Sequence, residues 1–149
     1  MKKINIIIIC CILAILTSAY LIFIHYSNTT SFCDISNQVS CDIVNKSSYS
    51  EIFNIPISLI SLLVFSFILL ISFHIKKNKE FSGFNRKELV NMIFYLMMFS
   101  LLFALYLVYI ELFVLYSICI LCLFLDILII VILITIIKLR INLYNAFNS

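Results

Sequence analysis

The sequence predicts an all-α integral membrane protein: a bundle of four transmembrane helices, with an extracytoplasmic loop and a short surface helix between the first two. Apolar residues make up 64% of the chain, charged residues 11%, and mean hydropathy is +1.21. Four apolar runs are each long enough to cross a bilayer. The basic residues lie beside these runs, which excludes a nucleic-acid-binding class, and a single Gly leaves no glycine-rich phosphate loop.

The spans are expected at residues 4–26, 56–75, 89–113 and 118–137. The first resembles a secretory signal with a weak cleavage site at residues 17–19, but its apolar run continues to Ile24, which favours an uncleaved helix. Pro56 stands where the second helix would begin, a position at which proline is tolerated. The whole chain, residues 1–149, is expected to form a single domain.

The basic residues predict the orientation in the membrane. The connector between the second and third spans carries five of the ten Lys and Arg residues, and the two termini carry four more. Because cytoplasmic segments are enriched in Lys and Arg, both termini are expected in the cytoplasm. Only Lys46 then lies on the other side, in the polar loop at residues 27–55.

Four of the six cysteines are expected on this extracytoplasmic side, as two pairs. Cys33 and Cys41 lie in the polar loop, and Cys119 and Cys122 form a C-x-x-C at the start of the fourth span, where both thiols share one helix face. Alone, the loop pair favours a structural disulfide. Together, the two pairs indicate a relay in which thiol–disulfide exchange passes electrons from one pair to the other. A four-thiolate zinc site is less favoured, because such sites usually combine two short knuckles in small soluble folds.

Other polar groups in the spans are interpreted more simply. Cys10 and Cys11 lie in the middle of the first span and are expected to be packing residues. Glu111 lies near the outer end of the third span and is expected to reach the interface. His25 is interpreted as a boundary residue, with assistance to thiolate formation as a weaker alternative.

The loop also predicts a lid. Residues 48–51 (SYSE) fit a capping box, and Ile52, Phe53 and Ile55 would place a short helix along the membrane surface, over a pocket. An ordinary polar loop with interfacial aromatic residues is the alternative.

A specific resemblance appears at this point. Residues 32–41 (FCDISNQVSC), followed by Ser47, Tyr49, Phe53 and an Ile-Pro pair at a span start, resemble the loop of the vitamin K epoxide reductase (VKOR) family. That family places a C-x-x-C at the start of its fourth helix, as this chain does. DsbB, a quinone-linked disulfide generator with four helices, has its two pairs in the opposite order and is the alternative within this class of enzyme.

The resemblance implies a route for electrons. A thioredoxin-like (DsbA-like) partner would reduce the pair Cys33 and Cys41, which would pass the electrons to Cys119 and Cys122, and Cys122 would reduce a quinone. Some family members carry the thioredoxin-like domain fused at their C-terminus. Since this chain stops soon after the fourth span, the partner is expected to be a separate protein. No metal is expected.

The resemblance also implies a quinone pocket. Ser47 corresponds to a loop serine that the family keeps near its redox centre, and Phe53 to an aromatic residue of the pocket wall. Asp126 follows Cys122 by four residues, so it would lie on the same helix stripe roughly 6 Å deeper. Its carboxyl could donate a proton or a hydrogen bond to the quinone, or it could form a helix–helix hydrogen bond, and the two interpretations remain open.

The expected location is a bacterial plasma membrane containing ubiquinone or menaquinone. Sequons at residues 28–30 and 45–47 keep the endoplasmic reticulum, with vitamin K as the quinone, as an alternative. The rival from another class is a non-catalytic membrane subunit in which Cys33 and Cys41 form a purely structural loop disulfide.

Overall fold

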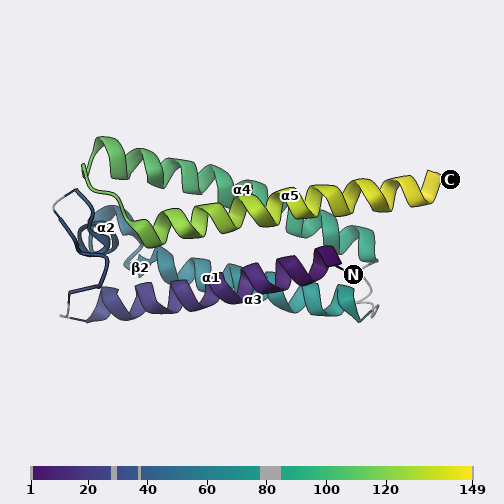
Figure 1. The fold of residues 1–149 in the computed structure, drawn as a ribbon, viewed down its shortest axis with the longest axis horizontal. Coiled ribbons are helices and arrows are strands. Elements are labelled where there is room, and N and C mark those ends of the chain that lie inside the picture. The colour runs from purple at the N-terminus through teal and green to yellow at the C-terminus, as the bar shows by residue number, and fades with distance from the viewer. Residues whose placement is uncertain (1, 28–29, 37, 78–84, 149) are drawn as a thin grey trace.

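The protein forms one bundle of four long helices, with small loop elements gathered at one end (Figure 1). The computed structural model describes residues 2–27, 30–36, 38–77 and 85–148, so the start of the first sequon and most of the basic connector lie outside the described residues. The long helices are α1 (Lys2–Tyr26), α3 (Ile57–Lys76), α4 (Arg86–Phe113) and α5 (Ile120–Asn148). The loop between α1 and α3 contains α2 (Cys41–Asn45), the 3₁₀ turn η1 (Ser48–Ser50), and the strands β1 (Glu51–Ile52) and β2 (Ile55–Pro56).

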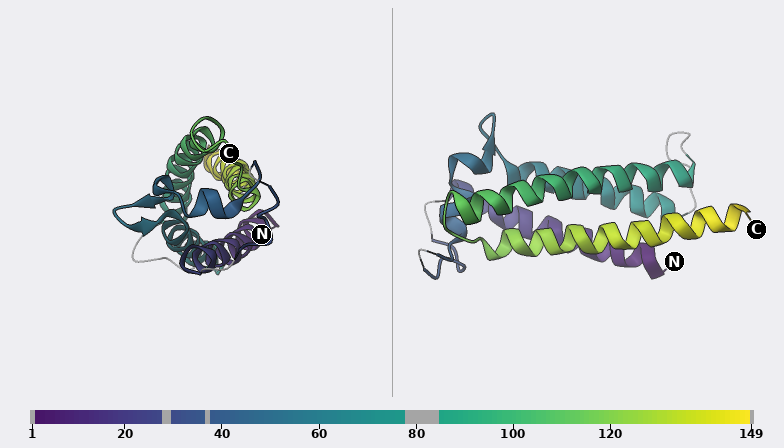
Figure 2. Two further views of the ribbon diagram at one scale, coloured as in Figure 1. Left: turned by 90° about the vertical axis from the view of Figure 1, so that its left-hand side faces the viewer. Right: turned by 90° about the horizontal axis from the view of Figure 1, so that it is seen from above.

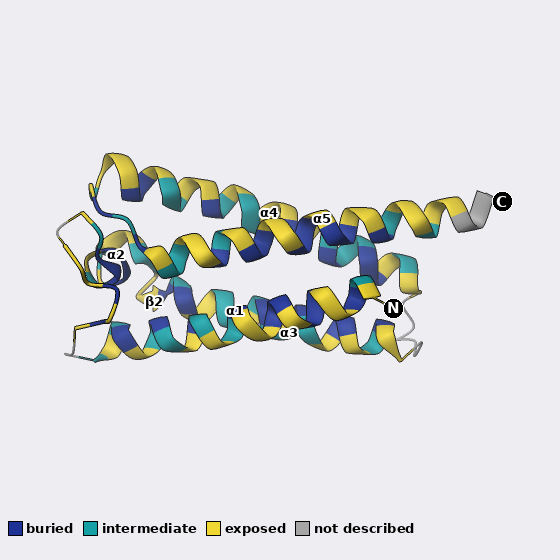
Figure 3. Cartoon of the chain, in the orientation of Figure 1, coloured by how far each residue is buried: buried dark blue, intermediate teal, exposed yellow. Residues whose placement is uncertain are grey.

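All four long helices are long and apolar enough to cross a membrane, which confirms the predicted fold class. The shortest, α3, has 20 residues and is therefore about 30 Å long, the thickness of a bilayer core. The outward faces of the helices are exposed, as Figure 3 shows, and they carry apolar side chains such as Leu16, Leu63 and Leu102, each more than 60% exposed. Such faces are stable against lipid, because the helices satisfy their own backbone hydrogen bonds.

Helix α1 packs against both α3 and α5, and α5 also packs against α4. The fourth side of the ring is looser, because α3 and α4 make few contacts with each other (Figure 2). Isoleucines fill the interior, and Ile7, Ile68, Ile93 and Ile132 are no more than 1% exposed. A hydrogen bond of 2.9 Å between the Ser18 and Ser61 hydroxyls joins α1 to α3.

The predicted spans match the helices closely except at the C-terminus. Helix α5 continues to Asn148, eleven residues past the predicted end of the span at residue 137. No Gly or Pro follows residue 137 to stop it, and Lys138 and Arg140 can extend their charged groups to water from a helix. Both termini lie at the end of the bundle opposite the loop (Figures 1 and 2).

The prediction of a surface helix that starts at a capping box at residues 48–51 is wrong. This segment is a single 3₁₀ turn followed by a hairpin in which β1 pairs antiparallel with β2. The hairpin turn residues Phe53 and Asn54 have φ values of 52° and 63°, as a type I′ turn requires. A short loop helix does exist, but it is α2, earlier in the chain.

Helix α2 is capped at its start and fixed to α1 at its end. The Ser40 hydroxyl accepts the Ile43 N–H at 3.1 Å, which satisfies one of the free donors of the first turn. At the other end, the Asn45 side chain donates to the Leu21 carbonyl at 2.7 Å, and the Asn45 carbonyl lies 2.8 Å from His25 Nδ1. His25 therefore ties the loop to α1.

Replacing Ser40 by alanine should loosen α2. Loss of an N-cap hydroxyl costs about 1 kcal/mol, so the α2 amides should exchange with deuterium roughly fivefold faster, as measured by mass spectrometry of the peptide that contains them. Ser36→Ala is the matched control, because Ser36 is exposed in the same loop and its side chain forms no hydrogen bond with the described residues. Equal exchange in the two variants would show that the cap does not hold α2.

Candidate active site

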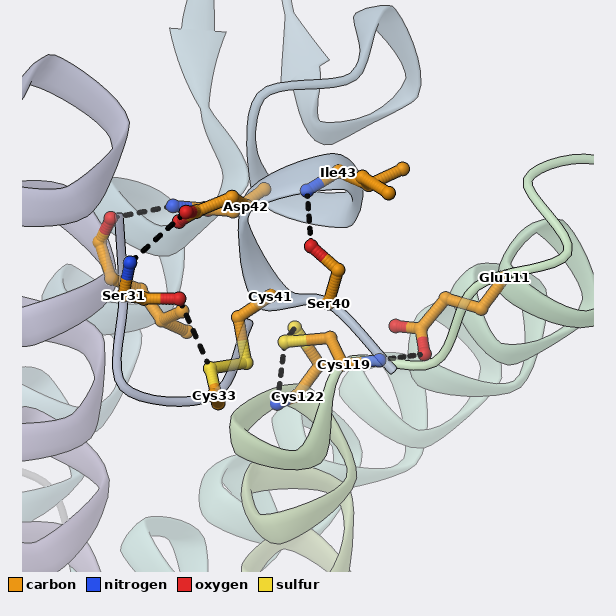
Figure 4. The surroundings of a disulfide bond; sticks show 11 residues. Ser31, Cys33, Ser40, Cys41, Asp42, Ile43, Glu111, Cys119 and Cys122 are labelled. Carbon is orange, nitrogen blue, oxygen red and sulfur yellow. Dashed lines mark hydrogen bonds between the residues drawn. A yellow bond between two sulfur atoms is a disulfide. The ribbon is translucent and has the colours of Figure 1, made fainter. Parts of the chain in front are cut away.

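Cys33 and Cys41 form a disulfide that is buried within the loop (Figure 4). Their Cα atoms are 5.7 Å apart, and the two residues are 2% and 0% exposed. The Ser31 hydroxyl lies 3.5 Å from Cys33 Sγ. Cys41 is also the first residue of α2, so the disulfide joins the start of this helix to the preceding loop.

The second pair of cysteines is reduced and lies at the start of α5. Cys119 immediately precedes the helix, and its Sγ accepts the Cys122 N–H at 3.2 Å, in the manner of an N-cap side chain. The Cys122 Sγ lies 2.6 Å from Cys119 Sγ. This proximity shows that the C-x-x-C has the geometry to close into a disulfide with little movement.

Backbone hydrogen bonds bring the two pairs together. Ile118 N–H donates to the Gln38 carbonyl at 2.9 Å, and Ser40 N–H donates to the Ile118 carbonyl at 3.2 Å. They form a parallel bridge between Val39 and Ile118. Since Ser40 precedes Cys41 and Ile118 precedes Cys119, the bridge places the two cysteine-bearing segments side by side. All four cysteines of the predicted relay therefore lie at one end of the bundle.

Glu111 departs from the sequence expectation. It does not reach the interface but is only 3% exposed, and its Oε2 accepts the Cys119 N–H at 3.1 Å. After α4 ends, the chain turns back through Tyr116, whose φ is 50°, and Ser117 N–H bonds to the Glu111 carbonyl at 3.1 Å. This turn directs the carboxylate inward, toward the start of α5 (Figure 4). The sequence did contain a signal for this role, because an acid within an otherwise apolar membrane span usually marks a functional position.

A cavity of about 230 Å³ lies beside Cys122, on the looser side of the bundle. Its walls come mainly from α3, α4 and α5, and the α2–η1 segment covers its loop end. The wall is largely apolar, but polar side chains gather toward the loop end and Cys122; they include Asn45, Ser47, Tyr49, Ser50, Ser58, Ser61, Glu111 and Asp126. Ile60 and Phe99 line the cavity and are also 36% and 69% exposed, so it opens sideways between α3 and α4.

The predicted pocket residues have different positions in the structure. Ser47 and Asp126 both line the cavity, and the Ser47 hydroxyl donates to the Val44 carbonyl at 2.8 Å. Phe53 does not line it: the side chain is 95% exposed at the hairpin turn. The physical reason is the positive φ of the turn, which replaces the helix that would have directed this ring toward the membrane.

The arrangement of the described side chains does not favour a metal site. Across the described ranges, no group of three or more His, Cys, Asp or Glu side chains is arranged to hold a metal ion. Two of the four thiols that a zinc site would need are joined in the disulfide.

Comparison with known proteins identifies the family. No curated protein sequence matched the chain. A family model described as the vitamin K epoxide reductase family matches residues 5–137, which include all four long helices in whole or in large part and all six cysteines. The chain therefore belongs to the vitamin K epoxide reductase family, and this membership implies a membrane disulfide oxidoreductase.

Proposed function

We propose that this protein is a single-domain membrane thiol–disulfide oxidoreductase that oxidises a separate thioredoxin-like protein and transfers the electrons to a quinone, thereby supporting disulfide formation. The observation that carries the proposal is the backbone bridge at Ile118, which holds an oxidised pair beside a reduced pair. Exchange between neighbouring pairs needs such contact, because a thiolate must attack a disulfide sulfur directly.

The first exchange is with the partner. A partner dithiol reduces the Cys33–Cys41 disulfide and becomes a disulfide itself, leaving two thiols in the loop. We assign the outer contact to Cys33, because its neighbours Phe32 and Ile35 are 72% and 70% exposed and offer an apolar surface to a docking protein. Cys41 lies deeper, beside the bridge.

The second exchange is within the chain. When Cys119 and Cys122 are a disulfide, the Cys41 thiolate attacks Cys119 and forms a mixed disulfide, releasing the Cys122 thiolate. Cys33 then attacks Cys41, which restores the loop disulfide and releases Cys119. Two electrons and two protons have then moved from the loop pair to the C-x-x-C.

The cavity suits a quinone ring as the electron acceptor. Its apolar wall accommodates a ring, its polar end accommodates ring oxygens, and the opening between α3 and α4 allows entry from lipid. A bound quinone supplies an acceptor for two electrons and two protons. Cys122 is the cysteine of the C-x-x-C that lines the cavity, so we assign it the contact with this substrate, and we assign Asp126 the transfer of a proton to a ring oxygen. Ubiquinone, menaquinone and vitamin K share this ring chemistry.

The orientation that we propose has both termini in the cytoplasm of a bacterial cell. Nine of the ten basic residues then lie on the cytoplasmic side, as membrane insertion favours. The loop pair faces the extracytoplasmic space, where disulfides form and persist.

Cysteine variants should separate the two halves of the reaction. Replacing both Cys33 and Cys41 by alanine should abolish oxidation of a reduced thioredoxin-like protein, while added quinone still oxidises Cys119 and Cys122, as measured by thiol alkylation and mass spectrometry. Cys122→Ala should abolish both reactions. Cys10→Ala is the control and should keep both, because Cys10 lies within α1. A C-x-x-C that never responds to quinone would instead favour the non-catalytic subunit.

The proposed order of exchange predicts which mixed disulfide can be trapped. A variant with Cys33→Ala and Cys122→Ala keeps, of the four relay cysteines, only Cys41 and Cys119, so a mild thiol oxidant such as diamide, which takes up the two electrons, should close a stable bond between them. The reciprocal variant, Cys41→Ala with Cys119→Ala, should form little or no bond between Cys33 and Cys122. Peptide mapping under non-reducing conditions distinguishes them, and equal trapping in both would contradict the order.

Asp126→Asn should slow the quinone half of the reaction. The amide keeps a hydrogen-bond donor but cannot release a proton, so quinone reduction by Cys119 and Cys122 should fall by about tenfold or more. Exchange between the loop pair and the partner should be unchanged. Unaltered turnover with quinone in membranes would assign Asp126 to helix packing.

A further inference from the structure

Glu111 is an acid buried at the end of an apolar helix, without a basic partner among the described residues. It is 3% exposed near the end of α4, and it forms no salt bridge within the described ranges. An unpaired carboxyl at such a position is costly, and the cost is usually retained where the group has a function. The proposed electron route assigns it none.

The two carboxyl oxygens of Glu111 have different surroundings. Oε2 is fixed by the Cys119 N–H at 3.1 Å, so the carboxyl is held directly beside the C-x-x-C. Oε1 makes no hydrogen bond within the described part of the chain, and the side chain lines the same cavity as Cys122 and Asp126. One oxygen is therefore anchored to a redox-active cysteine, while the other is left available to the space in which the acceptor would bind.

We propose that Glu111 is a proton carrier between the thiols of the C-x-x-C and the electron acceptor in the cavity. This inference rests on the proposed function and assigns a residue to its least defined step. When the dithiol closes to a disulfide, two electrons and two protons leave Cys119 and Cys122. Glu111 accepts the proton of one thiol as it becomes a thiolate and delivers a proton to one acceptor oxygen, while the proton of the other thiol passes to Asp126, which protonates the second oxygen, so that both carboxyls end the cycle as they began.

The position of Glu111 fits this role better than a purely structural one. A structural acceptor for the Cys119 N–H needs a single oxygen, which a serine, threonine or amide could supply at a helix start. A carboxyl that faces both the cysteine and the cavity adds a group that can exchange a proton. Bulk water is an inefficient alternative, because the cavity wall is largely apolar and the α2–η1 segment covers its loop end.

Two substitutions separate the anchoring role from the proton-transfer role. Glu111→Gln keeps an oxygen for the Cys119 N–H but cannot carry a proton, whereas Glu111→Leu removes both. Glu88→Gln is the matched control, because it is the same acid-to-amide change at the opposite end of α4, where Glu88 accepts the Asn85 N–H at 2.9 Å. A glutamine can replace glutamate in such a capping box.

Each variant is tested in two half-reactions of the full-length protein in detergent or lipid. The first is exchange from the loop dithiol to the oxidised C-x-x-C without quinone, and the second is reduction of a soluble ubiquinone analogue by the dithiol form without partner. Glu111→Gln should leave the first rate within about threefold of the wild type, since the amide oxygen keeps Cys119 in place. It should lower kcat of the second by about 100-fold, with KM within a similar threefold, as expected for loss of a general acid–base group.

The remaining variants complete the test. Glu111→Leu should slow both half-reactions. If Glu111→Gln restores the rate of thiol–disulfide exchange but not that of quinone reduction, the anchoring role and the proton-transfer role are separate. Glu88→Gln should match the wild type throughout. Retention of the Cys33–Cys41 disulfide after purification serves as the check that each variant has folded.

Two outcomes would overturn the proposal. If Glu111→Gln reduces quinone at the wild-type rate, Glu111 serves only to accept the Cys119 N–H. If both half-reactions slow equally, Glu111 only positions the C-x-x-C and transfers no proton. Failure of the proposed function is distinguishable, because the wild-type protein itself would then not reduce quinone.

Discussion

Two backbone hydrogen bonds to Ile118 support the rest of the site. They bind the loop strand that precedes Cys41 to the segment that precedes Cys119, so a loop far away in sequence is held in register with the start of α5. Without them, the loop pair would lie on a long polar connection with many conformations, and contact between the sulfur pairs would carry the entropy of closing that loop. The α2 cap at Ser40 and the Asn45 hydrogen bond to α1 hold the two ends of the helix that follows the bridge.

The membrane explains why polar groups are concentrated at this end. The four long helices satisfy their own backbone in lipid and need few side-chain hydrogen bonds, but the start of α5 leaves free N–H groups near the apolar interior. Glu111 accepts one from Cys119, and the Cys119 sulfur accepts one from Cys122. The same contacts that satisfy the helix start therefore fix the geometry of the C-x-x-C.

Much of this arrangement could be predicted from the sequence, because the strong signals were periodic or compositional. The four spans follow from hydropathy and length, and Asp126 and Cys122 share a stripe because the helix period places them there. The errors came where backbone conformation depends on tertiary contacts. Phe53 is an unusual residue for a turn position with positive φ, so a hairpin there gave no local signal. Glu111 could be placed only by knowing how the turn through Tyr116 returns the chain to the start of α5.

The loop links the two ends of the proposed reaction mechanically. The ten residues from Cys41 to Ser50 carry the loop disulfide at their start, and the residues from Val44 onward supply Val44, Asn45, Ser47, Tyr49 and Ser50 to the cavity wall. Helix α2 has five residues, capped at its start by Ser40 and tied to α1 at its end by Asn45, so it forms one compact unit with the residues that follow it. Reduction of the disulfide by a partner at Cys33 would release the start of the segment that also covers the cavity. The disulfide that the proposed partner would reduce and the cover of the proposed acceptor cavity thus share one small structural unit, and the bridge at Ile118 joins that unit to the second pair of cysteines.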